Sequence, residues 1–103
     1  MFVRAYSITK TLFEGEAEKL IAKTSVGELT ILDHHIPIIT VLAGPVKIFY
    51  RKEKEKIISE EMLELSFDFG FMEVRPEGDI ILLSSDPEAS RPIESVEISH
   101  QIM

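Results

Sequence analysis

The chain contains 103 residues, of which 45% are hydrophobic and 28% charged, a composition typical of an ordinary soluble globular domain. One domain of this length buries about two-thirds of its unfolded surface and needs no disulfide or metal, and the absence of cysteine excludes a disulfide framework, a thiol nucleophile and a cysteine-ligated zinc. The net charge of −7, from 18 acidic and 11 basic residues, argues against nucleic acid or anionic lipid as a partner and suits a basic surface on another protein better.

Neither a secretory signal nor a membrane span is predicted. The first residues, MFVRAYSITK, are too polar for a signal, and their apolar part is too short. No apolar run approaches the roughly 20 residues that cross a bilayer. We therefore expect no direct membrane insertion, and a protein that stays in the compartment where it is made or on that side of a membrane.

The first third of the chain predicts short strands separated by turns. Residues 3–9 open the chain as a strand, and residues 17–24 form a second one in which successive side chains alternate between two faces. Ser25, Val26 and Gly27 then turn the chain into a strand over residues 28–32.

The middle of the chain predicts two further strands and a hairpin. Pro37 is expected near the start of a strand or on a sheet edge, because proline cannot donate to a central ladder. The sequence Ala43-Gly44-Pro45 is expected to end that strand before another over residues 46–50. Residues 51–56, RKEKEK, alternate in sign and predict a solvated hairpin tip that leads to Ile57.

The clearest periodicity runs over residues 63–71. A strand would place five apolar side chains on one face, and we assign these to the core: Leu63, Leu65, Phe67, Phe69 and Phe71. After Gly70 the phase changes, since Met72 and Val74 are apolar while Glu73 is charged. A slip of one residue at a glycine predicts a bulge or sharp bend.

The last segments also read as strands. Residues 76–79, PEGD, predict a hairpin turn, and the unbroken run Ile80-Ile81-Leu82-Leu83 predicts a strand buried on both faces. Short strands at close spacing predict an all-β fold, a two-sheet β-sandwich or flattened barrel of about ten strands. Residues 1–86 form the domain, and residues 87–103 form a short C-terminal tail that fits neither the strand period nor the helix period cleanly.

The sequence contains no recognisable catalytic chemistry. His34 and His35 are adjacent and would point to opposite sides of a strand, and His100 lies in the tail, so these histidines do not predict a metal site. Asp33 and the histidines form no hydrolase triad, since no Gly-x-Ser-x-Gly turn is present, and there is no phosphate-binding glycine loop. Glu60 and Glu61 are expected on a solvated strand edge. We predict no catalytic, cofactor-binding or metal-binding residues, and a protein that works by binding.

Three motifs nevertheless point to one family. The first is LFEGEAE at residues 12–18, the second is GELTILDHHIPIITVL at residues 27–42, and the third is FGFMEV at residues 69–74. In this order and spacing, together with a closing strand that ends at Asp86, they resemble the N-terminal β-sandwich domain of the epsilon subunit of rotary F-type ATP synthases. The resemblance covers about residues 3–86.

The chain departs from the family pattern in several places. Thr30 and Phe69 each replace a usual glycine, Asp33-His34 replaces a usual Pro-Gly, and Ile36 replaces an alanine. Family members commonly continue into a two-helix hairpin that in some binds ATP through Ile-Asp-x-x-Arg-Ala. Here the matching stretch, IESVEI at residues 93–98, has Glu97 at the arginine position, and Pro87 and Pro92 discourage an earlier helix. We therefore expect neither the inhibitory hairpin nor a nucleotide site.

The resemblance implies a non-catalytic rotor subunit of the central stalk, which couples rotation of the c-ring to gamma and so couples ion transport, of protons or sodium, to ATP synthesis or hydrolysis. It places Val26, Gly27 and Glu28 toward the polar loops of the c-ring, which commonly carry a basic residue. It places Ser7, His35 and Thr40 toward gamma. The implied location is peripheral, on the cytoplasmic, stromal or matrix-equivalent face of the membrane as part of the synthase, and the isolated subunit is expected to be monomeric.

Two alternatives remain open from the residues themselves. A free-standing β-sandwich that binds a small ligand or a peptide would have a concave pocket and no affinity for rotor subunits. A small enzyme is the weaker alternative, because the chain lacks a triad, a metal cluster and a phosphate loop.

Overall fold

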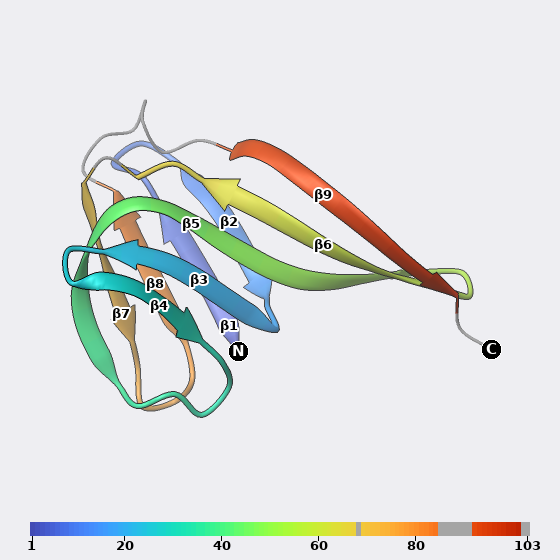
Figure 1. Ribbon diagram of the computed structural model, residues 1–103, viewed down its shortest axis with the longest axis horizontal. Coiled ribbons are helices and arrows are strands. Elements are labelled where there is room, and N and C mark those ends of the chain that lie inside the picture. Colours follow the sequence, from blue (N-terminus) through green and yellow to red (C-terminus); the bar gives the residue numbers. More distant parts are fainter. Residues whose placement is uncertain (68, 85–91, 102–103) are drawn as a thin grey trace.

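Nine β-strands and no helix make up the described part of this computed structural model, which covers residues 1–67, 69–84 and 92–101 (Figure 1). The predicted all-β fold is confirmed. The predicted boundary between domain and tail at residues 86 and 87 lies outside the described residues. The strands are β1 (Phe2–Tyr6), β2 (Thr11–Glu16), β3 (Lys19–Thr24), β4 (Gly27–Ile31), β5 (Ile38–Lys54), β6 (Ile57–Leu65), β7 (Gly70–Val74), β8 (Ile80–Ser84) and β9 (Pro92–Gln101).

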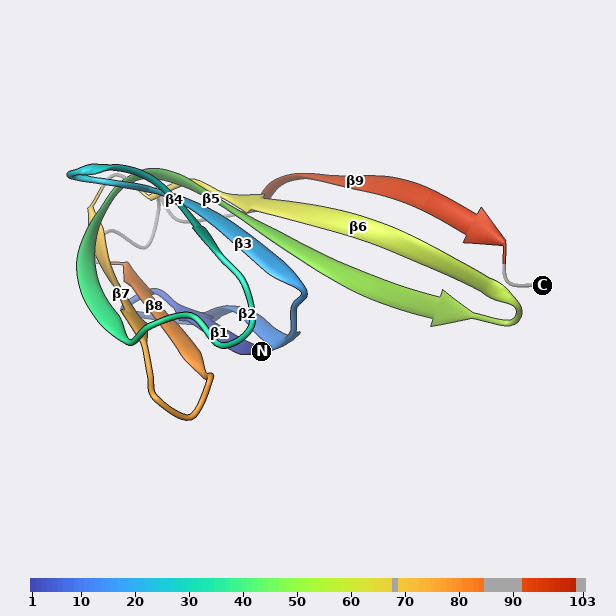
Figure 2. The same cartoon turned by 60° about the horizontal axis from the view of Figure 1, so that its bottom comes forward.

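The strands form two layers joined by β5. The hydrogen-bonded order is β2-β1-β8-β7-β5-β3-β4, and β6 pairs with β5 and β9. All pairs are antiparallel except β1 with β8. The first half of β5 pairs with β7, whereas its second half pairs with β3 and β6. Figure 2 shows β1, β2, β7 and β8 below and β3, β4, β6 and β9 above, with β5 curving from one layer into the other.

The hydrophobic core lies between the two layers. One layer contributes Val3, Ala5, Met72, Val74, Ile80 and Leu82, and the other contributes Leu20, Ala22, Ile31, Val46, Ile48 and Leu65. Alternate residues of each strand supply these side chains, as the period of a strand requires. Phe67, in the connection between β6 and β7, is 1% exposed and is the largest of the fully buried side chains.

The predicted break at Ala43-Gly44-Pro45 is wrong, because β5 continues through it as a single strand. Ala22 pairs with Val46 and Thr24 pairs with Leu42, so residues 43–45 oppose the single residue Lys23. This irregularity is where β5 bends between the layers, and it accommodates a proline because ladder hydrogen bonds are interrupted there. The following hairpin is also longer than predicted, since β5 extends to Lys54 and only Glu55 and Lys56 separate it from β6. Glu60 and Glu61 do not lie on a sheet edge, because β6 runs between β5 and β9.

The predicted change of phase near Gly70 occurs, but two aromatic assignments are wrong. Leu65 and Phe67 are buried as expected, whereas Phe69 is 49% and Phe71 45% exposed. Gly70, Met72 and Val74 are buried in β7. The slip therefore falls between Phe67 and Phe69, ahead of the glycine, and the last two phenylalanines lie on the outer side of the layer.

The run Ile80-Ile81-Leu82-Leu83 is buried on one face only, which corrects the prediction of burial on both faces. Ile80 and Leu82 are fully buried, while Leu83 is 48% exposed. The predicted turn at residues 76–79 is confirmed, with Gly78 at φ 96° and its amide donating to the Arg75 carbonyl. Residues 92–101 form β9, which pairs with β6. No helix in the described residues is long and apolar enough to cross a membrane.

Candidate partner interface

The predicted ring-facing residues form the exposed turn between β3 and β4. The buried Thr24 hydroxyl donates to the Gly27 carbonyl at 2.6 Å and accepts from the Val26 amide at 3.2 Å. Gly27 has φ 127°, a conformation that other residues rarely adopt. Val26 is 84% exposed, and Glu28 is exposed beside it. The turn is thus held from beneath by one hydroxyl while its outer side chains remain accessible.

This turn is also tied to β5. The Ser25 amide donates to the Val41 carbonyl at 3.1 Å, and Thr24 pairs with Leu42. The Gly-Glu turn is therefore anchored beside the place where β5 bends between the layers.

Ser7 lies in the turn that joins β1 to β2. Its hydroxyl accepts hydrogen bonds from the amides of Thr9 and Lys10 and donates to the Lys10 carbonyl. The Ser7 amide also donates a hydrogen bond to the Lys10 carbonyl at 2.8 Å. These contacts define a local structural role for Ser7 that does not depend on a partner.

His35 and Thr40 lie before and within the start of β5. The His35 ring nitrogen Nδ1 is 2.7 Å from the Ile36 carbonyl oxygen, and His34 beside it has φ 66°. Thr40 is half-buried and pairs with Met72, a core residue, so it lies on the inward side of β5. The sequence-predicted gamma-facing residues therefore come from the β1–β2 turn, the β4–β5 loop and an inward position of β5.

The register separates these residues. Four residues that pair in succession form a row across the sheet: Ser84, Gly70, Leu42 and Thr24. Ser7 follows Tyr6, which pairs with Leu83, so Ser7 lies at one end of this row and the β3–β4 turn lies at the other. His35 instead lines a depression with Met1, Pro76 and Asp79, at the other ends of the strands. The predicted set is thus spread around the layer and does not form one cluster.

The loop that carries His35 is fixed by the α-ammonium of Met1. This group contacts Asp33 Oδ1 at 2.8 Å and Glu16 Oε2 at 3.3 Å, and it donates to the Ala17 carbonyl. The hydrogen bond with Asp33 raises the pKa of the ammonium above its usual value and lowers the pKa of the Asp33 carboxyl. These charges join the β4–β5 loop to the end of β2.

Sequence reasoning missed an apolar surface on the outer side of the β1–β8–β7–β5 layer. We call it the outer apolar face, and it consists of Ile39, Val41, Phe69, Phe71 and Leu83. Phe71 pairs with both Val41 and Leu83, and the Phe69 and Phe71 rings meet edge to face with centroids 5.5 Å apart. Ile39 is 74% exposed. Contiguous exposed apolar residues of this kind mark interaction surfaces.

A signal for this surface exists in the sequence. The segment from Phe67 to Val74 contains apolar residues in both phases of the alternation, so one set must face outward. Gly70 decides which set, because a Cβ at this position would lie 2.3 Å from the Leu83 carbonyl oxygen. The close approach of β8 at Gly70 places this glycine on the packed side and its phenylalanine neighbours outside.

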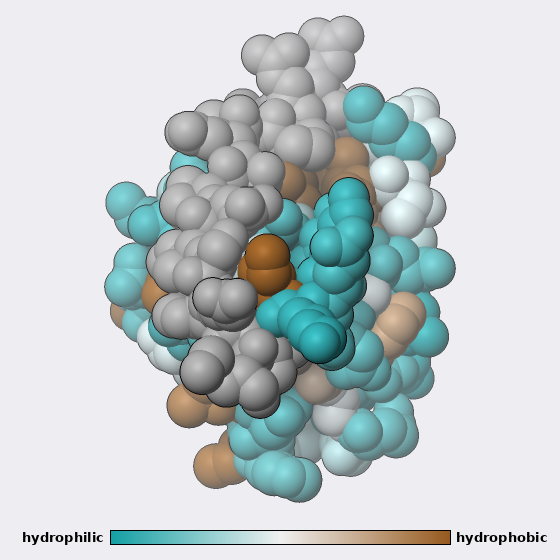
Figure 3. All heavy atoms as spheres, turned by 90° about the vertical axis from the view of Figure 1, so that its right-hand side faces the viewer, coloured by the Kyte–Doolittle hydropathy of each residue, from teal (hydrophilic) through white to brown (hydrophobic). Residues whose placement is uncertain are grey.

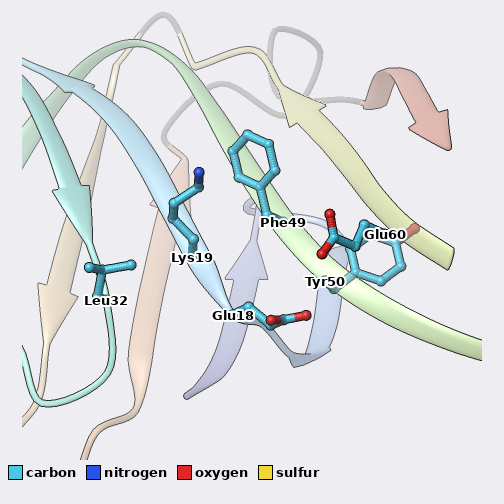
Figure 4. A pocket seen from close by; sticks show the side chains of 6 residues that line it. All are labelled: Glu18, Lys19, Leu32, Phe49, Tyr50 and Glu60. Carbon is cyan, nitrogen blue, oxygen red and sulfur yellow. The ribbon is translucent and has the colours of Figure 1, made fainter. Parts of the chain in front are cut away.

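Figure 4 shows one of several depressions in the surface that could receive a small ligand. It measures about 260 Å³ and is lined by Glu18, Lys19, Leu32, Phe49, Tyr50 and Glu60. Lys19 Nζ lies 4.5 Å from the Phe49 ring centroid, and Arg51 binds both Glu18 oxygens at 3.0 and 3.3 Å. This depression is smaller than the roughly 300–1,000 Å³ of typical ligand pockets, and contacts within the chain engage the charges of Glu18 and Lys19. The depression beside His35 measures about 380 Å³ and reaches that range.

Among residues 1–67 and 69–84, whose side chains the structure describes, no group of three or more His, Cys, Asp or Glu residues is placed to hold a metal ion. Burial raises the pKa of the Tyr50 hydroxyl, and a hydrogen bond with Glu61 raises it further.

Comparisons with known proteins agree on one family. A family model for the ATP synthase delta/epsilon chain β-sandwich domain matches residues 1–85. An ATP synthase epsilon chain of Mycobacterium tuberculosis (strain ATCC 25618 / H37Rv) is 32% identical over 83 residues, which is 81% of this chain and 64% of that protein. The epsilon chain of Mycobacterium avium (strain 104) is 33% identical over 93 residues, 90% of this chain and 73% of that one.

Solved structures show the same fold. A chain of the Euglena gracilis mitochondrial ATP synthase, in a cryo-EM structure of OSCP/F1/c-ring, superposes with a TM-score of 0.70 at 16% identity over 87% of this chain and 51% of that chain. A chain from the central stalk/c-ring of the Tetrahymena thermophila mitochondrial ATP synthase superposes with a TM-score of 0.67 at 20% identity. The match covers 84% of this chain and 63% of that chain. The chain spans less than two thirds of the length of the M. tuberculosis relative and of both structural matches.

Proposed function

The chain belongs to the ATP synthase delta/epsilon chain β-sandwich family, and on that premise we propose that it is a non-catalytic rotor subunit of the central stalk. In this role it couples rotation of the c-ring to gamma, and so couples ion transport to ATP synthesis or hydrolysis. The observation that carries the proposal is the family match over residues 1–85, which includes every strand from β1 to β8.

The fold suits a part that transmits torque. Close-packed protein interiors resist compression and pass strain on with little deformation. The core here joins both layers through fully buried side chains such as Leu20, Ile48 and Leu82. Strand β5 adds a covalent connection, because it runs unbroken through both layers. A force applied at the β3–β4 turn would therefore reach the opposite layer without a hinge.

The outer apolar face is the surface that we assign to gamma. Its exposed phenylalanines resemble the aromatic residues that dominate binding energies at protein interfaces. Ser7 flanks the same layer, and in this proposal it contributes to the edge of the contact while His35 contributes from the β4–β5 loop. Thr40 lies on the inward side of β5 and would support the contact through its neighbours Ile39 and Val41. The exposed apolar residues on this layer, among them Ile39, Phe69 and Phe71, support docking of a protein there.

The β3–β4 turn is the surface that we assign to the c-ring. Glu28 would make a charge-assisted contact with a basic residue of the ring loops, with Val26 and Gly27 beside it. Exposed ion pairs of this kind contribute about 1 kcal/mol or less and weaken as salt increases. The turn would therefore guide the orientation of the subunit on the ring, and most of the affinity would come from gamma.

In this role the protein is a peripheral component of a membrane-bound complex and contacts the membrane sector only through other subunits. Its acidic net charge of −7 is compatible with basic partner surfaces.

The proposal is tested by reconstitution. A synthase stripped of its own epsilon subunit is mixed with this protein, and ATP-driven ion uptake into vesicles is measured together with ATP hydrolysis. We expect uptake per ATP hydrolysed to rise when the protein is added. A protein that leaves this ratio unchanged and stays unbound, yet binds a peptide or small ligand on its own, would be a free-standing binding module instead.

A further inference from the structure

Part of the upper layer extends beyond the sandwich as a three-stranded arm. We define the arm as residues 50–54 of β5, 57–61 of β6 and 97–101 of β9, and Figures 1 and 2 both show it reaching away from the other strands. Viewed along the arm, Figure 3 shows mainly hydrophilic residues at the end of the β5–β6 hairpin, with hydrophobic residues behind them. The outer apolar face belongs to the other layer, so the arm is a separate surface.

The two edges of the arm differ in how they are protected. Strand β3 stops opposite Phe49, so β5 has an open edge from residue 51 onward, which carries the charged sequence Arg51-Lys52-Glu53-Lys54. Charged residues on an edge strand discourage further pairing. On the other side, β9 pairs only with β6 among the described strands, and its sequence PIESVEISHQ contains neither lysine nor arginine. The edge of β9 is therefore the one that remains open to another strand.

The charges of successive strands indicate what kind of strand would fit. In the register of β5 and β6, Arg51 is opposite Glu60 and Lys47 is opposite Glu64, whereas Glu61 is opposite Tyr50. On the far side of β6, however, Glu61 is opposite Glu97 of β9. Like charges at directly opposed positions destabilise an antiparallel pair. A strand with basic residues beyond β9 would offset this repulsion.

We propose that the free edge of β9 binds an extended basic segment of a partner protein, which adds to the sheet as a further strand. Main-chain hydrogen bonds along β9 provide the affinity, and opposite charges around Glu94 and Glu97 select the partner. A second copy of this chain fits poorly, because two acidic β9 strands would meet and each molecule carries a net charge of −7. This site is additional to the contacts with gamma and the c-ring.

The test uses synthetic peptides of ten residues, the length of β9. A fluorescent peptide that alternates lysine and valine is titrated with the full chain at about 0.15 M salt, where general charge attraction is screened. The control peptide keeps every lysine but has proline in place of two central valines, so it retains its charge and cannot complete a ladder. Fluorescence anisotropy gives the affinity, and amide hydrogen exchange shows where the peptide binds.

We expect the lysine-valine peptide to bind and to slow amide exchange in β9, and we expect the proline peptide to bind at least about tenfold more weakly. Glu97→Lys should weaken binding by about fivefold or more, since it reverses the charge of the proposed edge. Glu53→Lys makes the same change of net charge on the other edge of the arm and should change the affinity by less than about twofold. Without peptide, amide exchange in β9 should be slower in the Glu97→Lys variant, because the substitution removes the like charge opposite Glu61. Slower exchange would show that β9 of the variant is still paired with β6.

Several results would overturn the proposal. These are an absence of binding, equal binding of both peptides, protection confined to strands other than β9, and equal weakening by the two substitutions. Sedimentation that shows a dimer formed through β9 would also overturn it, because the occupant would then be a second copy. None of these outcomes affects the reconstitution with the synthase, so the two proposals fail separately.

Discussion

The carbonyl oxygen of Leu83 occupies the space in which a side chain on Gly70 would begin, since a Cβ added to Gly70 would lie 2.3 Å from it. Gly70 pairs with Ser84 in the β7–β8 ladder, one position away from the pair formed by Phe71 and Leu83. The contact sets β7 against β8 and so determines that Phe71 faces outward. The identity of one small residue thereby supports the outer apolar face.

Gly70→Ala should therefore destabilise the fold by about 1–3 kcal/mol, because backbone on a central strand cannot move away as a flexible side chain can. Urea unfolding followed by circular dichroism measures the loss. Gly15→Ala is the matched control, since its added Cβ would be 3.6 Å from the Phe13 ring, an ordinary contact distance. Equal stability of the two variants would show that β7 and β8 do not approach as closely as described.

Thr24→Val should loosen the β3–β4 turn. The change keeps the shape of the side chain but removes the hydroxyl that bonds Val26 and Gly27, at a cost of about 1–2 kcal/mol for a buried group. Amide exchange at Val26 should accelerate more than exchange in the core strands. Thr30→Val, at an exposed position of β4, should leave both quantities nearly unchanged. Unaltered exchange at Val26 in the Thr24 variant would contradict the described turn.

Much of the architecture could be predicted from local chemistry. Gly27 and the sequence Pro76-Glu77-Gly78-Asp79 marked turns that the structure contains, because positive φ angles and proline restrict the backbone locally. The phase change near Gly70 was also visible, since it depends only on the alternation of neighbouring residues.

Features that depend on distant partners could not be predicted in this way. Alternation separates two faces of a strand but does not identify which one is covered, so Phe69 and Phe71 were assigned to the wrong side. The continuity of β5 depends on its pairing with Lys23 and its neighbours, and the strand character of residues 92–101 depends on β6. The assignments of Ser7, His35 and Thr40 rested on resemblance, and they stay predictions.

Glu28→Lys should weaken binding to the c-ring by about fivefold at low salt and by less at high salt, because exposed charge contacts are screened. The fold should be unaffected, since Glu28 is exposed in the β3–β4 turn. Co-sedimentation with purified rings at two salt concentrations measures the effect. Glu53→Lys, on the distant arm, is the control with the same charge change, and comparable losses in the two variants would remove the assignment of this turn to the ring.

The most direct measurement is the affinity of the protein for the gamma subunit of the same synthase, by isothermal titration with the unaltered chain, Phe71→Thr and Ile57→Thr. The two substituted side chains are 45% and 44% exposed, on the outer apolar face and on the arm respectively. We predict tight binding that Phe71→Thr weakens about tenfold or more and that Ile57→Thr leaves within about twofold. No binding of the folded, unaltered chain to gamma would contradict the proposed role as a rotor subunit, and equal affinities of all three proteins would contradict docking through the outer apolar face.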